Sequence, residues 1–180
     1  MKKVALAIGT ILILGIPAVL ISQFTLDNVE KEIAREHPVS HLPVEHLVKK
    51  LASPDSSAVM LFDVRKEEEY RVSHLKNAIR IDPEMSGEAF LKQYGKLLEN
   101  KQAVFYCSVG KRSSIMVERV KSVLNKLQTV HPRALYNLRG GIFRWYNNGY
   151  PVYNDSTETD SVHPFNKIWG QLLQKRKTSR

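Results

Sequence analysis

The sequence predicts an α/β domain of three layers, with a mostly parallel central sheet flanked by helices and preceded by an N-terminal transmembrane helix. Three observations indicate this fold class. Short apolar runs alternate with segments of helical periodicity between residues 39 and 153. A stretch without charged side chains fills residues 4–26. The single cysteine, Cys107, excludes a fold held by internal disulfides, and 180 residues suffice for one well-packed domain with an appendage.

The apolar stretch at residues 4–26 has the length of about 20 residues that a helix needs to cross a bilayer. Lys2 and Lys3 precede it and a net acidic segment follows, so the positive-inside rule leaves the N-terminus in the cytoplasm. We therefore expect a single-pass anchor in a bacterial inner membrane, with the domain facing the periplasm or the cell exterior. The alternative is a cleaved signal and a soluble periplasmic domain, although the stretch offers no good Ala-x-Ala-like cleavage site.

The elements that follow are each indicated by their own pattern. Residues 27–38 are polar with scattered apolar positions, which is typical of a short juxtamembrane helix or a spacer. Pro43 opens a helix with apolar residues at helical spacing over 44–51. Short continuous apolar runs are typical of buried parallel strands. In chain order we expect a strand at 58–62, a helix at 66–75, a strand at 78–81, a helix at 87–100, a strand at 103–106, a helix at 113–127, a strand at 134–138 and a short helix after Gly140 and Gly141.

The chain thus divides into a membrane anchor or signal sequence (1–26), a juxtamembrane spacer (27–38), the domain (39–153) and a basic C-terminal tail (154–180). Within the tail, apolar residues form a narrow stripe on a basic helix over residues 166–177. They are Ile168, Trp169, Leu172 and Leu173. We expect this helix to cap the domain or to fray, and contact with anionic lipid is the alternative.

The composition argues against two classes of ligand. Basic residues exceed acidic residues by nine, and six of the basic residues lie within ten positions of the two ends. Because no basic run interleaved with aromatic residues marks the middle, we expect no nucleic-acid partner. The histidines at 37, 41 and 46 are interrupted by Pro38 and Pro43, so we also expect no metal site.

Cys107 lies where an expected strand ends and a helix begins, in a polar loop that contains Gly110, Lys111 and Arg112. Active sites of open parallel sheets gather at the carboxyl ends of strands. Backbone N–H groups of such a loop, the helix N-terminus and the two cations favour a thiolate nucleophile and an anionic substrate. An inert buried cysteine is the alternative, but it does not account for a doubly basic loop.

Four pieces of the sequence, in this order, resemble the rhodanese-like domain family. They are Leu61-Phe62-Asp63-Val64-Arg65; Glu69-Tyr70 with His74-Leu75 and Ala78-Ile79; the loop from Tyr106 to Ser113; and Leu138-Arg139-Gly140-Gly141 with Trp145, Gly149, Pro151 and Val152. The resemblance covers residues 39–153. One departure is that Ser73 and Asn77 stand where the family usually has glycine at two turns, although asparagine also tolerates a positive φ.

The resemblance implies a sulfurtransferase that needs no cofactor. Cys107 would take sulfane sulfur from a small anionic donor such as thiosulfate, hold it as a persulfide, and pass it to a thiol or cyanide acceptor. Asp63 and Arg65 would support the site. The residues implied to bind substrate are Ser108, Val109, Gly110, Lys111, Arg112 and Ser113. The alternative is a non-catalytic rhodanese-like binding or sulfur-carrier module, tethered to the membrane by its N-terminal helix.

A cysteine phosphatase or arsenate reductase is the rival enzyme class. Such enzymes place arginine after five intervening residues, so that it grips three oxyanion oxygens. Here four residues separate Cys107 from Arg112, and Ser113 occupies the position where the arginine is needed. A loop one residue shorter is too tight for phosphate, and we therefore expect no phosphatase activity.

Overall fold

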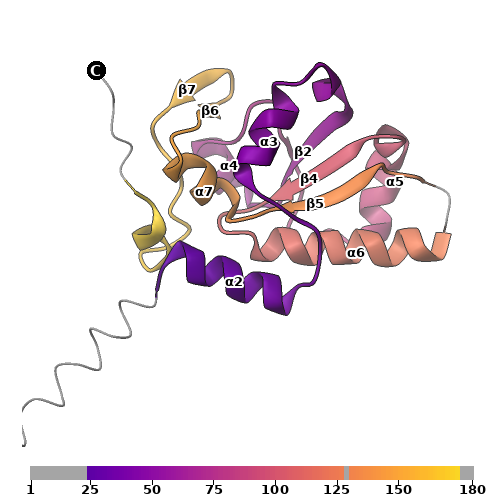
Figure 1. Ribbon diagram of the computed structural model, residues 1–180, viewed down its shortest axis with the longest axis horizontal. Helices are drawn as coiled ribbons and strands as arrows, with labels where there is room; N and C mark the ends of the chain where they lie inside the picture. The colour runs from indigo at the N-terminus through magenta and orange to yellow at the C-terminus, as the bar shows by residue number, and fades with distance from the viewer. Residues whose placement is uncertain (1–23, 128–129, 175–180) are drawn as a thin grey trace, which may run out of the picture.

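Five parallel strands form the centre of the structure, a computed structural model that describes residues 24–127 and 130–174 (Figure 1). The strand order is β1-β5-β4-β2-β3, and every pair of neighbours runs parallel. The strands are β1 (His41–Leu42), β2 (Val59–Asp63), β3 (Ile79–Arg80), β4 (Gln102–Tyr106) and β5 (Ala134–Leu138). The α/β class with a parallel central sheet is confirmed, and the one strand of this five-stranded sheet that the sequence did not indicate is the two-residue β1.

Helices cover both faces of this sheet. Residues of α2 (Leu26–Glu36), α3 (Val44–Leu51) and α7 (Gly141–Asn147) form one hydrophobic cluster with the sheet. Residues of α5 (Gly87–Leu98) and α6 (Lys111–Leu127) form a second cluster. Two further short helices are η1 (Pro54–Ala58) and α4 (Glu67–Val72). Strand β4 is buried along its whole length because Val104 packs into the first cluster and Phe105 into the second.

Most of residues 27–38 belongs to helix α2 (Leu26–Glu36), which packs on the domain, so the structure supports the helix alternative for this segment. Thr25 caps α2 at its N-terminus, and Leu26 and Ile33 are buried. The carboxylate of Glu30 is buried as well, and it accepts hydrogen bonds from Arg139 (3.0 Å) and Arg144 (2.7 Å). A buried carboxylate needs such partners. The sequence did not indicate this contact, because the buried face of α2 includes a charged side chain between its apolar ones.

The segment after residue 153 is also folded against the domain, as one of the two expected alternatives had it, but its secondary structure differs from the expected helix. Strands β6 (Val152–Asn154) and β7 (Thr157–Thr159) form an antiparallel hairpin, and a 3-10 helix, η2, spans Trp169–Leu172. The longer helix expected from residue 166 is wrong over the described residues, because Leu173 already has an extended backbone. The expected stripe is divided: Leu172 is buried, whereas Ile168 is 62% exposed.

The expected membrane anchor falls almost entirely on residues 1–23, which lie outside the described residues. Across residues 24–127 and 130–174, no helix combines the length and the apolar composition that a membrane span requires.

Candidate active site

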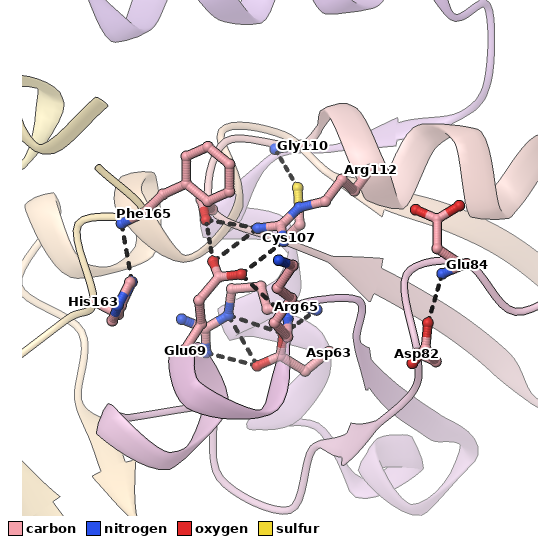
Figure 2. Close-up of polar contacts among 12 residues, drawn as sticks. Asp63, Arg65, Glu69, Asp82, Glu84, Cys107, Gly110, Arg112, His163 and Phe165 are labelled. Atoms are coloured by element: carbon pink, nitrogen blue, oxygen red, sulfur yellow. Dashed lines mark hydrogen bonds and ion pairs between the residues drawn. The ribbon is translucent and has the colours of Figure 1, made fainter. Parts of the chain in front are cut away.

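The loop after β4 curls around the sulfur of Cys107. The backbone N–H of Gly110 donates a hydrogen bond to Sγ over 3.2 Å, and the cysteine side chain is only 1% exposed (Figure 2). Gly110 has a φ of 109°, and a Cβ there would lie 3.1 Å from the side-chain nitrogen of Asn137. Both the backbone conformation and the space therefore favour glycine at the turn that brings the N–H to the sulfur.

The N-terminus of α7 is hydrogen-bonded to this loop and fixes its position. The N–H groups of Ile142 and Phe143 donate to the carbonyl oxygens of Cys107 (2.9 Å) and Ser108 (3.0 Å). Gly141 makes the close approach possible, since a Cβ at this residue would lie 2.2 Å from the carbonyl oxygen of Cys107. In a trans peptide the next N–H points away from the carbonyl. These bonds therefore turn the following loop N–H groups away from α7.

An ion pair with the buried carboxylate of Glu69 holds the partly buried Arg112 near the sulfur. Its guanidinium donates to the two carboxylate oxygens of Glu69 over 2.7 and 2.8 Å and to Ser108 Oγ over 3.1 Å. Burial raises the pKa of Glu69, but the hydrogen bond and charge of Arg112 outweigh it and hold that pKa below its ordinary value. Burial lowers the pKa of Arg112, yet Glu69 and the nearby Cys107 raise it on balance. Both partners therefore stay charged at neutral pH.

The comparison with protein families agrees with this geometry. The rhodanese-like domain model matches residues 44–148, which is more than half of the chain. The chain belongs to the rhodanese-like domain family. A search of curated proteins found no match.

Solved structures share the rhodanese fold. The As-Sb reductase of Leishmania major is 28% identical with a TM-score of 0.55, over 62% of this chain and 79% of that one. The thiosulfate sulfurtransferase of Pseudomonas aeruginosa is 19% identical with a TM-score of 0.53, over 80% of this chain and 26% of that one. A Bacillus halodurans protein is 17% identical with a TM-score of 0.53, over 81% of this chain and 98% of that one. The last two similarities concern the fold alone.

Asp63 and Arg65 of this rhodanese domain lie together, fully buried, at the end of β2. Arg65 donates to both carboxylate oxygens of Asp63 and, over 2.5 Å, to the carbonyl oxygen of Ser73. Burial lowers the pKa of Arg65, but the charge of Asp63 raises it well above its ordinary value. The pair therefore ties the end of β2 to the segment after α4, and its contacts are structural.

The other expected binding residues point in different directions. Val109 is buried in the hydrophobic cluster around α7. Ser113 Oγ donates to the side-chain oxygen of Asn137 over 2.6 Å. The Lys111 ammonium pairs over 2.9 Å with Glu36, at the end of α2. Of the seven-residue loop, the structure therefore gathers Cys107, Ser108, Gly110 and Arg112, and directs the other side chains elsewhere.

Two residues that shape the candidate site were among those that carry the family resemblance, but the sequence assigned no site role to them. Glu69 is 1% exposed although it is an acid in the first turn of a charged helix, and only its position in the fold reveals Arg112 as its partner. Gly141 was expected at a turn, but its close approach to the carbonyl oxygens of Cys107 and Ser108 depends on the tertiary fold. Spacing along the chain gives no signal for either contact.

Proposed function

We propose that this rhodanese domain is a sulfurtransferase, which moves sulfane sulfur from a small anionic donor such as thiosulfate to a thiol or cyanide through a persulfide on Cys107. The observation that carries the proposal is the hydrogen bond from the Gly110 N–H to Sγ, in a loop at the carboxyl end of the central strand. This places one backbone donor on the sulfur, and the guanidinium of Arg112 lies nearby.

The transfer takes two displacement steps and needs no oxidant. In the first, the Cys107 thiolate attacks the outer sulfur of thiosulfate; the new S–S bond to Sγ forms while the donor's S–S bond breaks, and sulfite leaves with the electron pair. In the second, the acceptor thiolate or cyanide attacks the same sulfur atom. The bond to Sγ then breaks, and Cys107 returns as a thiolate.

Backbone groups supply most of the charge stabilisation in this proposal. The N–H of Gly110 and the N-terminus of the 17-residue helix α6 both favour negative charge on the sulfur atoms. Arg112 contributes a positive charge that is partly neutralised by Glu69. Lys111 pairs with Glu36 at the surface, so we assign it only a weak part in attracting the donor.

The relation to the As-Sb reductase of Leishmania major makes an oxyanion reductase or phosphatase the second candidate. Two features of this chain favour sulfur transfer over it. Four residues separate Cys107 from Arg112, and both terminal nitrogens of Arg112 already donate to Glu69. An arginine that must grip an oxyanion needs these nitrogens. We expect no turnover of arsenate or of aryl phosphates.

We also propose that residues 1–26 anchor the domain in a bacterial inner membrane, with the active site outside the cytoplasm. The support is the charge-free stretch and the lysines before it. Since α2 begins at Leu26 and is fixed to the domain by Glu30, a long flexible spacer does not follow the stretch. Alkaline phosphatase fused after Arg180 should be active in intact cells, and an inactive fusion would contradict this topology.

The central experiment is mass spectrometry of the intact protein after incubation with thiosulfate. We expect an adduct of about +32 Da, roughly one sulfur atom, on the wild type and none on Cys107→Ser. Addition of cyanide should remove the adduct and release thiocyanate in repeated turnovers. A single round of loading without turnover would favour the carrier alternative. Absence of the adduct together with arsenate reduction would favour the second candidate.

A further inference from the structure

The segment after the β6–β7 hairpin runs past the active site. We call residues 160–174 the C-terminal strap; it lies outside the span of 44–148 that matches the family. The ring of Phe165 lies over the guanidinium of Arg112, with 5.0 Å between the ring centroid and Cζ (Figure 2). Because Arg112 is next to Cys107, the strap brings an aromatic ring to the edge of the catalytic loop.

Phe165 is held at this place by an unusual backbone. Its φ is 64°, in the left-handed region that bulky L residues rarely adopt. Its N–H donates to the ring nitrogen Nδ1 of His163 over 3.0 Å. Directly after it, the side-chain oxygen of Asn166 accepts from the N–H groups of Ile168 and Trp169, both over 3.0 Å. Such a conformation persists only when its surroundings determine it, and it often marks a functional position.

Both ends of the strap are attached to α7, the helix that braces the catalytic loop. The hydroxyl of Tyr146 donates to the carbonyl oxygen of Asp160 over 2.8 Å. The side-chain nitrogen of Asn147 donates to the carbonyl oxygen of Leu172, also over 2.8 Å, and Leu172 is buried. The strap therefore has fixed ends, and Phe165 lies between them.

Phe165 itself contributes little to the core. Its side chain is 43% exposed, and its ring lies against Arg112. Burial of the ring in the core would offset the cost of a strained backbone. The ring of Phe165 instead contacts a charged group of the proposed active site. Cys107 is 1% exposed, so any acceptor must pass the residues that cover its sulfur.

We propose that Phe165 determines which molecules reach Cys107. The ring forms the wall of the site on the side of the strap, and it admits compact ions such as thiosulfate and cyanide while it slows bulky thiols. The inference rests on the proposed sulfur transfer for its consequence in catalysis. The accessibility of the Cys107 thiol to reagents can be measured whether or not the protein transfers sulfur.

The experiment uses Cys107 as its own probe, because it is the only thiol in the chain. Alkylation rates are measured with iodoacetamide and with fluorescein maleimide, a bulky reagent, for the wild type, Phe165→Ala and Phe165→Leu. The control is Ile168→Ala, on the same strap and 62% exposed. We expect Phe165→Ala to speed the bulky reagent about tenfold and iodoacetamide much less. Phe165→Leu should lie between, and the control should match the wild type.

A second measurement compares the kinetics of sulfur transfer to two acceptors, a bulky thiol and cyanide. Phe165→Ala should raise kcat/KM for a bulky thiol acceptor relative to kcat/KM for cyanide. Equal alkylation of the wild type and both Phe165 variants by both reagents overturns the inference, whether or not the persulfide forms. If the alkylation contrast appears but no persulfide adduct is found, the sulfur-transfer proposal fails and the role of Phe165 in access stands. If Phe165→Ala does not fold, the contrast between Phe165→Leu and the wild type decides.

Discussion

The proposed catalytic loop (107–113) and the C-terminal strap border the same candidate site, but they are held in different ways. The loop is fixed by buried contacts: N–H groups of α7 on its carbonyl oxygens, and Glu69 on Arg112. The strap is attached at two ends and presents exposed side chains between them. Buried contacts resist local opening, whereas surface contacts are lost without unfolding the domain. We infer that the loop sets the chemistry and that the strap sets the access to it.

The largest expected effect comes from the contact that braces the loop. Gly141→Ala would place a Cβ 2.2 Å from the carbonyl oxygen of Cys107, at a φ of 54°. We expect a loss of about 2–4 kcal/mol of unfolding free energy, together with loss of persulfide formation, because the loop must move to relieve the clash. Chemical denaturation and the thiosulfate adduct are the two measurements.

Gly149→Ala is the matched control for this substitution. Gly149 also has a positive φ, 82°, but a Cβ there would meet no heavy atom within 4 Å. It should cost only the backbone penalty, about 1–2 kcal/mol, and leave the adduct intact. Equal effects of the two substitutions would show that backbone strain, and not the contact with the loop, explains the requirement at Gly141.

A smaller effect is expected where the loop's arginine is paired. Glu69→Gln removes the negative charge from a buried site and leaves Arg112 without its counterion. We expect a loss of about 1–3 kcal/mol of unfolding free energy at neutral pH. Glu68→Gln, an exposed neighbour on α4, should leave the stability within about 0.5 kcal/mol of the wild type.

The effect of Glu69→Gln on the free energy of unfolding should depend on pH. Arg112 holds the folded-state pKa of Glu69 below its ordinary value of 4.5, so the unfolded chain binds the proton more readily than the folded one. The contribution to stability is therefore complete above the ordinary value and is lost as the pH falls through the folded-state pKa. The stability gap between the wild type and Glu69→Gln should narrow below about pH 4.5. A gap that is constant from pH 7 to strongly acidic pH would contradict the assignment.

The sequence predicted the parallel sheet and the position of Cys107 because both depend on local patterns. Continuous apolar runs such as β4 indicate buried strands, and a polar loop after one of them indicates a site. The β6–β7 hairpin escaped prediction, since its strands are only three residues long. The sequence did not indicate that helix α2 packs on the core, because a glutamate such as Glu30 is typical of a surface position. Only the fold shows that Arg139 and Arg144 pair with it.

The two cations of the loop illustrate the same limit within the site. Both follow Cys107 closely in the sequence, which led us to expect that both attract the donor. A helix directs neighbouring residues about 100° apart, so Lys111 and Arg112 cannot face the same partner. Arg112 meets Glu69 beside the sulfur, and Lys111 meets Glu36 at the surface. Which of two adjacent residues faces inward depends on the packing of α6.

The smallest expected effect is therefore at Lys111. Its ammonium is about half exposed, and a surface ion pair of this kind contributes at most about 1 kcal/mol. Lys111→Ala should change the KM for thiosulfate less than about twofold at physiological salt, and somewhat more at low salt, where its charge is less screened. Arg112→Lys should instead reduce kcat/KM by about tenfold or more, because lysine cannot bridge both oxygens of Glu69. If Lys111→Ala has the larger effect at both salt concentrations, the exposed cation and not the buried ion pair receives the donor.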